Sequence, residues 1–75
     1  MNLEDFITGF ADLFDDTDPS EIVAETNFHE LDEWSSLISM SLMAYVRTEF
    51  GKKITGNEIR TCDTVKSLYD LIESK

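Results

Sequence analysis

Two adjacent serines, Ser35 and Ser36, stand where an acidic, irregular stretch gives way to a helical apolar pattern. A serine just before a helix is favoured because its hydroxyl oxygen accepts a hydrogen bond from an unpaired backbone N–H two or three residues later. One such cap is enough, and Ser35 fits that role. Ser36 would then lie in the first turn, where a phosphate on its hydroxyl would meet exposed N–H groups and the positive end of the helix dipole. Spacing alone leaves open that both are ordinary helix-start residues.

The sequence lacks the residue patterns of common catalytic and metal sites. It contains no G-x-S-x-G, no H-E-x-x-H and no glycine-rich phosphate loop. Its single histidine, His29, lies in the loop between Phe28 and Glu30 and is expected at the surface or against a partner, and not as a catalytic residue. Residues 16–21 begin like a calcium loop, but Pro19 interrupts the oxygen donors and Glu21 replaces the turn glycine. We therefore expect neither an enzyme nor a dedicated metal site.

The charge of the chain is concentrated in its first half. Residues 1–35 carry eleven acids and no Lys or Arg, whereas residues 36–75 carry five acids and six bases. Such a field repels nucleic acid and anionic membranes and favours encounter with basic protein surfaces.

The single cysteine, Cys62, allows no internal disulfide and is expected as a small buried residue at a helix end. With no apolar run as long as a membrane span, we expect a cytoplasmic monomer.

The elements that would position these serines are helices. For a chain of 75 residues, an all-helical bundle is the most economical way to bury a core. Residues 2–15 place apolar side chains at helical spacing, and the period is then lost over a long loop. In this loop Pro19, with Asp18 as its cap, is expected to open a helical turn over residues 20–24. Five apolar residues are expected to pin the loop to the core: Ile22, Val23, Phe28, Leu31 and Trp34.

Residues 36–50 predict the longest helix, which ends at Gly51. Thr55 and Glu58 predict a capping box that opens a short helix through about Cys62. A last helix is expected from Thr64, with Asp63 as its cap. The predicted fold is therefore all-α, with three longer helices, one short helix and a long loop between the first two, in one domain over residues 1–75. The longest helix is expected to bury Ile38, Leu42, Tyr45, Val46 and Phe50 and to leave Leu37, Met40 and Ala44 off that face.

Taken in order, these pieces resemble the acyl carrier protein family. The family signature is Asp-Ser-Leu at the start of the second helix, followed by an apolar-patterned helix that ends in acidic residues, Phe and Gly. The matching segments here are Trp34-Ser35-Ser36-Leu37, Thr48-Glu49-Phe50-Gly51, Asp63-Thr64-Val65 and Leu68-Tyr69-Asp70-Leu71-Ile72. The similarity covers essentially the whole chain. Its Glu-Trp-x-Ser-Leu form looks most like the free-standing bacterial carriers, and not like a domain cut from a megasynthase.

The resemblance implies a 4'-phosphopantetheine arm on Ser36. A phosphopantetheinyl transferase would take this arm from coenzyme A and join it to the serine through a phosphodiester. The thiol of the arm would hold acyl intermediates as thioesters and present them to fatty-acid or specialised lipid and polyketide biosynthetic enzymes. The chain itself would be a carrier and make no bonds. Met40 and Met43 are adaptable side chains that suit a bundle which parts to admit an aliphatic chain.

Two features depart from the family pattern. Ser35 stands where the family has Asp, and the helix over residues 36–50 has Glu49 as its only acid. The acids lie instead on the loop ahead of Ser36. We therefore expect the partner enzymes to dock on that loop and on the neighbouring apolar patch, namely on Glu30, Asp32, Glu33, Ser35, Leu37, Met40 and Ala44. The unusual helix also favours a specialised pathway over bulk fatty-acid synthesis.

Two alternatives stay open from the residues. An acidic helical adaptor or inhibitor that binds a basic protein surface would need the acids but not Ser36, and it would carry no prosthetic group. A carrier-like fold that has lost its modification is a third hypothesis, to which Ser35 gives some support.

Overall fold

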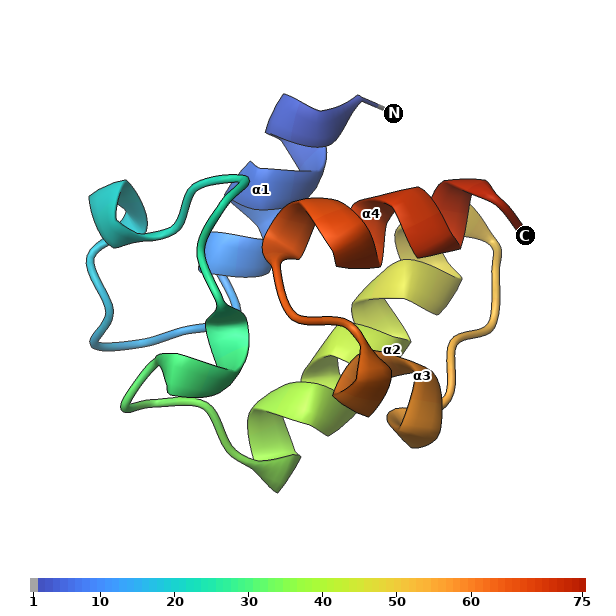
Figure 1. Ribbon diagram of the computed structural model, residues 1–75. Coiled ribbons are helices and arrows are strands. Elements are labelled where there is room, and N and C mark those ends of the chain that lie inside the picture. Colours follow the sequence, from blue (N-terminus) through green and yellow to red (C-terminus); the bar gives the residue numbers. More distant parts are fainter. Residues whose placement is uncertain (1) are drawn as a thin grey trace.

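Among residues 2–75, which the computed structural model describes, there are four α-helices and two 3₁₀ turns but no β-strand (Figure 1). The helices are α1 (Leu3–Ala11), α2 (Ser36–Phe50), α3 (Gly56–Thr61) and α4 (Val65–Glu73). The turns η1 (Pro19–Glu21) and η2 (Phe28–Glu30) lie in the long connection between α1 and α2. The predicted all-α fold, with its short third helix and long first loop, is confirmed.

Helix α1 is shorter than predicted, because it ends at Ala11 and not at Asp15. The Asn2 side chain caps it by accepting a hydrogen bond from the Asp5 N–H at 2.8 Å. After Ala11, the Phe14 N–H bonds the Ala11 carbonyl at 3.1 Å, a tighter pattern than that of an α-helix. Phe14 is therefore buried although it lies beyond the end of the helix. Its spacing from the earlier apolar residues is the reason why a longer helix was predicted.

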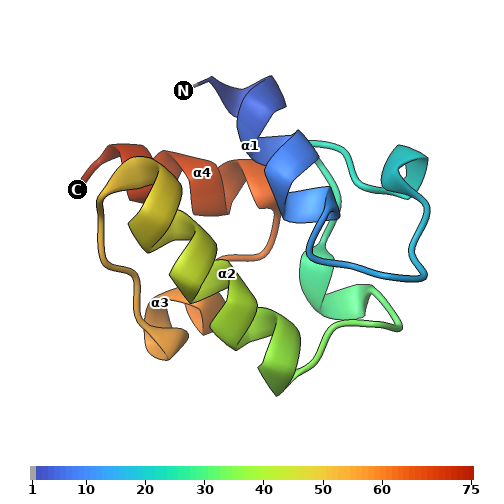
Figure 2. The same cartoon turned by 180° about the vertical axis from the view of Figure 1, so that it is seen from behind.

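Aromatic side chains join three helices in the core. The Phe6 ring of α1 lies 5.7 Å from the Phe50 ring of α2 and 5.6 Å from the Tyr69 ring of α4, measured between centroids. Helix α4 packs against α1, and α3 packs against α2. The start of α2 lies at the opposite end of the molecule from both chain termini (Figures 1 and 2). This leaves the predicted serine site on a free end of the bundle.

The long loop is fixed at the N-terminal end of α4. The N–H groups of Val65 and Lys66 donate to the carbonyls of Thr26 and Ala24 at 3.0 and 2.9 Å. Five apolar loop residues were expected as pins. Ile22 and Phe28 are buried, and Leu31 and Trp34 pack against the core. Val23 is 47% exposed, so its predicted burial is wrong. In an extended backbone neighbouring side chains point in opposite directions, and the buried Ile22 turns Val23 outward.

Two local predictions for this region are corrected in detail. The 3₁₀ turn after Pro19 ends at Glu21, not at Ala24. Asp18 caps it as predicted, and the backbone hydrogen bond from Ser20 is the main reason why the pKa of this carboxyl is lowered. Helix α4 is capped by Thr64 and not by Asp63, because Thr64 and Ser67 form a capping box at 3.0 and 3.1 Å.

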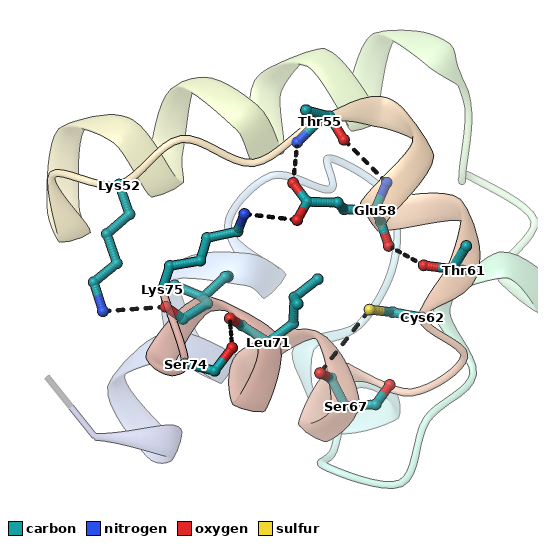
Figure 3. Close-up of polar contacts among 10 residues, drawn as sticks. Lys52, Thr55, Glu58, Thr61, Cys62, Ser67, Leu71, Ser74 and Lys75 are labelled. Carbon is teal, nitrogen blue, oxygen red and sulfur yellow. Dashed lines mark hydrogen bonds and ion pairs between the residues drawn. The ribbon is translucent and has the colours of Figure 1, made fainter.

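The short helix α3 is tied to the C-terminal end of α4 (Figure 3). The predicted capping box is confirmed, with Thr55 and Glu58 bonded reciprocally at 3.0 and 3.2 Å. The second carboxylate oxygen of Glu58 pairs with the Lys75 Nζ at 2.6 Å. Within residues 2–75, no helix is both long enough and apolar enough to cross a membrane.

Candidate functional site

Ser36 is the first residue of α2, and its side chain is exposed. The residue before it, Ser35, has extended backbone, and its hydroxyl accepts a hydrogen bond from the Ile38 N–H at 3.3 Å. The division of roles expected from the sequence is therefore found: Ser35 caps the helix. The hydroxyl of Ser36 is left out of capping and lies at the positive end of a 15-residue helix.

A pocket of about 480 Å³ opens beside Ser36. It lies between the first turns of α2, the helix α3 and the segment around η2. Its volume is in the range of sites that hold small molecules. The residues that matter most for its chemistry are Ser36, Met40 and Met43 from α2, Ile59 and Arg60 from α3, and His29 from η2.

The pocket combines an apolar wall with a cation. Met40, Met43 and Ile59 offer flexible or aliphatic surface, which suits an aliphatic group. Arg60 is exposed, and its guanidinium donates to the Asn57 side-chain oxygen at 3.0 Å. An anion joined to Ser36 would lie in the same pocket as this guanidinium, and opposite charges attract there. No pattern in the sequence marks Arg60, because only the packing of α3 against α2 brings it to the pocket beside the serine.

His29 is not the surface or partner-facing histidine that we expected. Its ring is partly buried, with its centroid 4.3 Å from that of Phe28 and 5.6 Å from that of Trp34. Its Nε2 lies 3.2 Å from the Ile59 carbonyl oxygen and 2.8 Å from the Cys62 carbonyl oxygen. Both partners are acceptors only, so Nε2 carries the hydrogen. The expectation is therefore corrected: the imidazole of His29 bonds the C-terminal end of α3. The residues next to His29 in the sequence could not predict this contact, because its partners lie 30 and 33 residues away.

One of the acids expected to meet partners, Glu33, bonds the chain's own loop. Its carboxylate accepts the backbone N–H groups of Asp15, Asp16 and Thr17 at 2.8, 3.1 and 2.9 Å. It also accepts the Thr17 hydroxyl at 2.7 Å. These bonds, that of the Thr17 hydroxyl first, lower the pKa of the Glu33 carboxyl. Glu33 thus joins the two ends of the long loop.

The remaining residues of the expected docking surface lie on the outside of the molecule. Leu37 and Met40 are 72% and 63% exposed. Among residues 2–75, few other large apolar side chains are this exposed to solvent. The predicted exposure of Leu37 and Met40 is confirmed. The other members of this surface are also exposed: Glu30, Asp32, Ser35 and Ala44.

Cys62 is buried at the C-terminal end of α3, as expected. Its thiol lies 4.0 Å from the Ser67 carbonyl oxygen (Figure 3). Burial is the main reason why the pKa of this thiol is raised, which favours its protonated form. Across the part of the chain that the structure describes, no three His, Cys, Asp or Glu side chains are grouped to hold a metal ion.

A helical bundle that presents an exposed serine at the start of its longest helix, beside a pocket with an apolar wall, has the architecture of a carrier domain. The model of the family described as the phosphopantetheine attachment site matches residues 5–72, and the chain belongs to this family. Its members are non-catalytic carriers with a covalent 4'-phosphopantetheine group, and they interact with biosynthetic enzymes. The predicted carrier role is confirmed at this level, in preference to the acidic adaptor. No protein with a curated description matches the chain.

Proposed function

We propose that Ser36 is the residue to which 4'-phosphopantetheine is attached. The observation that carries this proposal is the separation of the two serines: Ser35 uses its hydroxyl as the helix cap, and Ser36 exposes its own. A phosphodiester forms at the Ser36 oxygen as the pyrophosphate bond of coenzyme A breaks, and the nucleotide half of coenzyme A leaves. This reaction needs a phosphopantetheinyl transferase as a partner.

The residues around Ser36 fit such an arm. The first N–H groups of α2 and the Arg60 guanidinium favour a negative phosphodiester at this end of the helix. Met40, Met43 and Ile59 provide apolar surface for a thioester-bound acyl chain. When attached, the arm supplies the thiol that holds the acyl group. The protein shelters and presents that group, and its own side chains make and break no acyl bond.

We propose that the partner enzymes dock on the loop ahead of α2 and on the exposed side of α2. Glu30 and Asp32 provide charge for a basic enzyme surface, and Leu37, Met40 and Ala44 provide an apolar patch next to it. Ser35 lies between the two. The transferase and the acyl-transfer enzymes would share this surface because both must reach Ser36. Glu33 is left out, since its carboxylate is bonded to residues 15–17.

The acyl group belongs to fatty-acid or specialised lipid or polyketide biosynthesis. The exposed side of α2 favours a specialised pathway, because Glu49 is the only acid in that helix. We further propose that residues 1–75 form one carrier domain, similar to the bacterial carriers, which works as a monomer in the cytoplasm.

Intact-mass measurement tests the attachment. The wild type, Ser36→Ala and Ser35→Ala are each incubated with coenzyme A and a phosphopantetheinyl transferase. We expect the mass of one phosphopantetheine group to be added to the wild type and to Ser35→Ala, and not to Ser36→Ala. No mass gain in the wild type with several transferases would indicate a carrier fold that has lost its modification. A gain retained in Ser36→Ala would place the arm on another residue.

A further inference from the structure

We propose that His29 is a positioning residue that holds α3 in place and so sets how far the pocket beside Ser36 opens. The pocket's use as a shelter for the acyl group rests on the proposed function above. The hold of His29 on α3 is a property of the unmodified chain. The two can therefore be tested separately.

Helix α3 is held by the apolar packing of Ile59 and by polar contacts at both of its ends. It has six residues, and Ile59 is its buried one. A helix of this length is not stable on its own and depends on its neighbours. Two side chains from outside reach it: Lys75 pairs with Glu58 near its first turn, and His29 bonds its last turn. The first contact faces the end of α4, whereas the second faces the pocket.

The backbone of His29 is anchored to the rest of the fold. The His29 backbone N–H donates to the Asn27 side-chain oxygen at 3.0 Å. Asn27 pairs with Thr64 in an isolated antiparallel bridge, which ties this segment to the start of α4. The neighbouring Phe28 is fully buried in the core. The imidazole therefore extends from an anchored segment, and its bond restrains α3 more than a bond from a mobile loop would.

The position of this bond couples it to the pocket wall. At the C-terminal end of α3, the Nε2–H of His29 donates to the Cys62 carbonyl and is a second donor to the Ile59 carbonyl, which already accepts the Cys62 backbone N–H at 3.3 Å. One of the two carbonyls belongs to Ile59, and Ile59 and His29 are both among the residues that line the pocket. If the bond is lost, the end of α3 can move away from α2, and the wall that Ile59 forms moves with it.

Amide hydrogen exchange of the unmodified protein tests the hold directly. His29→Phe keeps a ring of similar size but removes the donor, whereas His29→Gln keeps an N–H donor. We expect His29→Phe to speed exchange of the amides of α3 by about fivefold relative to the core amides of α4, the factor that corresponds to a lost hydrogen bond of about 1 kcal/mol. His29→Gln should restore most of the protection. Equal acceleration in α3 and α4 would show a merely structural histidine and overturn the proposal.

The modified protein gives a second reading. Chains loaded with an octanoyl arm from octanoyl coenzyme A are treated with hydroxylamine, and the rate of thioester cleavage is followed by mass. We expect the thioester of His29→Phe to be cleaved about fivefold faster than that of the wild type. This is again the factor that corresponds to a lost hydrogen bond of about 1 kcal/mol. Lys75→Met is the matched control: it loosens the other end of α3 and should leave cleavage unchanged. An equal increase in Lys75→Met, or no increase in His29→Phe, would overturn the proposal. If no arm can be attached at all, the proposed function fails, and the exchange experiment still decides the role of His29.

Discussion

The phenol ring of Tyr45 in α2 lies so close to Gly9 in α1 that a side-chain carbon on residue 9 would overlap the phenol. Glycine in a helix interior costs about 1 kcal/mol relative to alanine. From the sequence alone, Gly9 is therefore expected to lower the stability of α1. The structure supplies the reason for it. The missing side chain lets the two helices approach, and the Tyr45 ring reaches Phe6, with a centroid distance of 6.0 Å.

Gly9→Ala should destabilise the fold, although alanine is the better helix former. The added methyl group forces α1 and α2 apart or displaces the Tyr45 ring, and such overpacking costs about 1–3 kcal/mol. Urea unfolding followed by circular dichroism measures the change. Gly56→Ala is the control, because open space surrounds that position and the substitution should be neutral or stabilising. A Gly9→Ala variant as stable as wild type would contradict the close packing of Tyr45.

The Glu33 carboxylate should make stability depend on pH. Its pKa in the folded state lies below the ordinary value of 4.5. Its contribution is therefore fully present above pH 4.5 and is lost as the pH falls through the lower folded-state pKa. We expect Glu33→Gln to lower the free energy of unfolding at neutral pH, and the gap to wild type to narrow in acid. Urea unfolding at several pH values measures this.

Thr17→Val serves as the matched partner for that experiment. The Thr17 hydroxyl bond is the main cause of the lowered pKa of Glu33, so its removal should weaken the same pH dependence while the backbone bonds to the carboxylate remain. Glu30→Gln changes an exposed acid on the same loop and should leave stability unaltered. A gap between Glu33→Gln and wild type that stays constant from neutral to acid pH would rule out this role for the carboxylate.

Charge reversal separates the proposed docking loop from the rest of α2. The double variant Glu30→Lys, Asp32→Lys should lower kcat/KM for modification by the transferase by about threefold to tenfold at low salt, and less at high salt. Glu49→Lys, at the other end of α2, should have a smaller effect. Glu33 is kept intact in this series because its loss would disturb the loop itself. Equal effects of the double variant and of Glu49→Lys would sink the docking proposal.

Ser35 can be probed apart from Ser36. Ser35→Ala removes the cap of α2 and should lower the free energy of unfolding by about 1 kcal/mol. Ser35→Asp keeps a capping oxygen and adds the carboxylate that the family pattern has at this position. We expect it to raise kcat/KM for modification about threefold, since a charge beside the site steers a basic enzyme. Unchanged modification in Ser35→Asp would mean that the transferase does not use this position.

Much of the scaffold around Ser36 follows from the sequence. The cap at Ser35, the stop at Gly51 and the capping box of Thr55 with Glu58 were all predicted and are all present. Gly51 adopts the left-handed φ of 66° that helix ends favour in glycine. These features depend on hydrogen bonds within one helical turn, so the local residue types are enough to determine them.

The environment of the serine was decided by the tertiary structure. The Glu33 carboxylate accepts a hydrogen bond from the Thr17 hydroxyl, 16 residues away, and no local sequence pattern predicts this bond. His29 likewise reaches the carbonyl of Cys62, 33 residues away, and Arg60 joins the pocket only because α3 packs against α2. Helix periodicity determines which side chains share a face. Which faces meet depends on how the helices pack together, and that arrangement exists only in the folded chain.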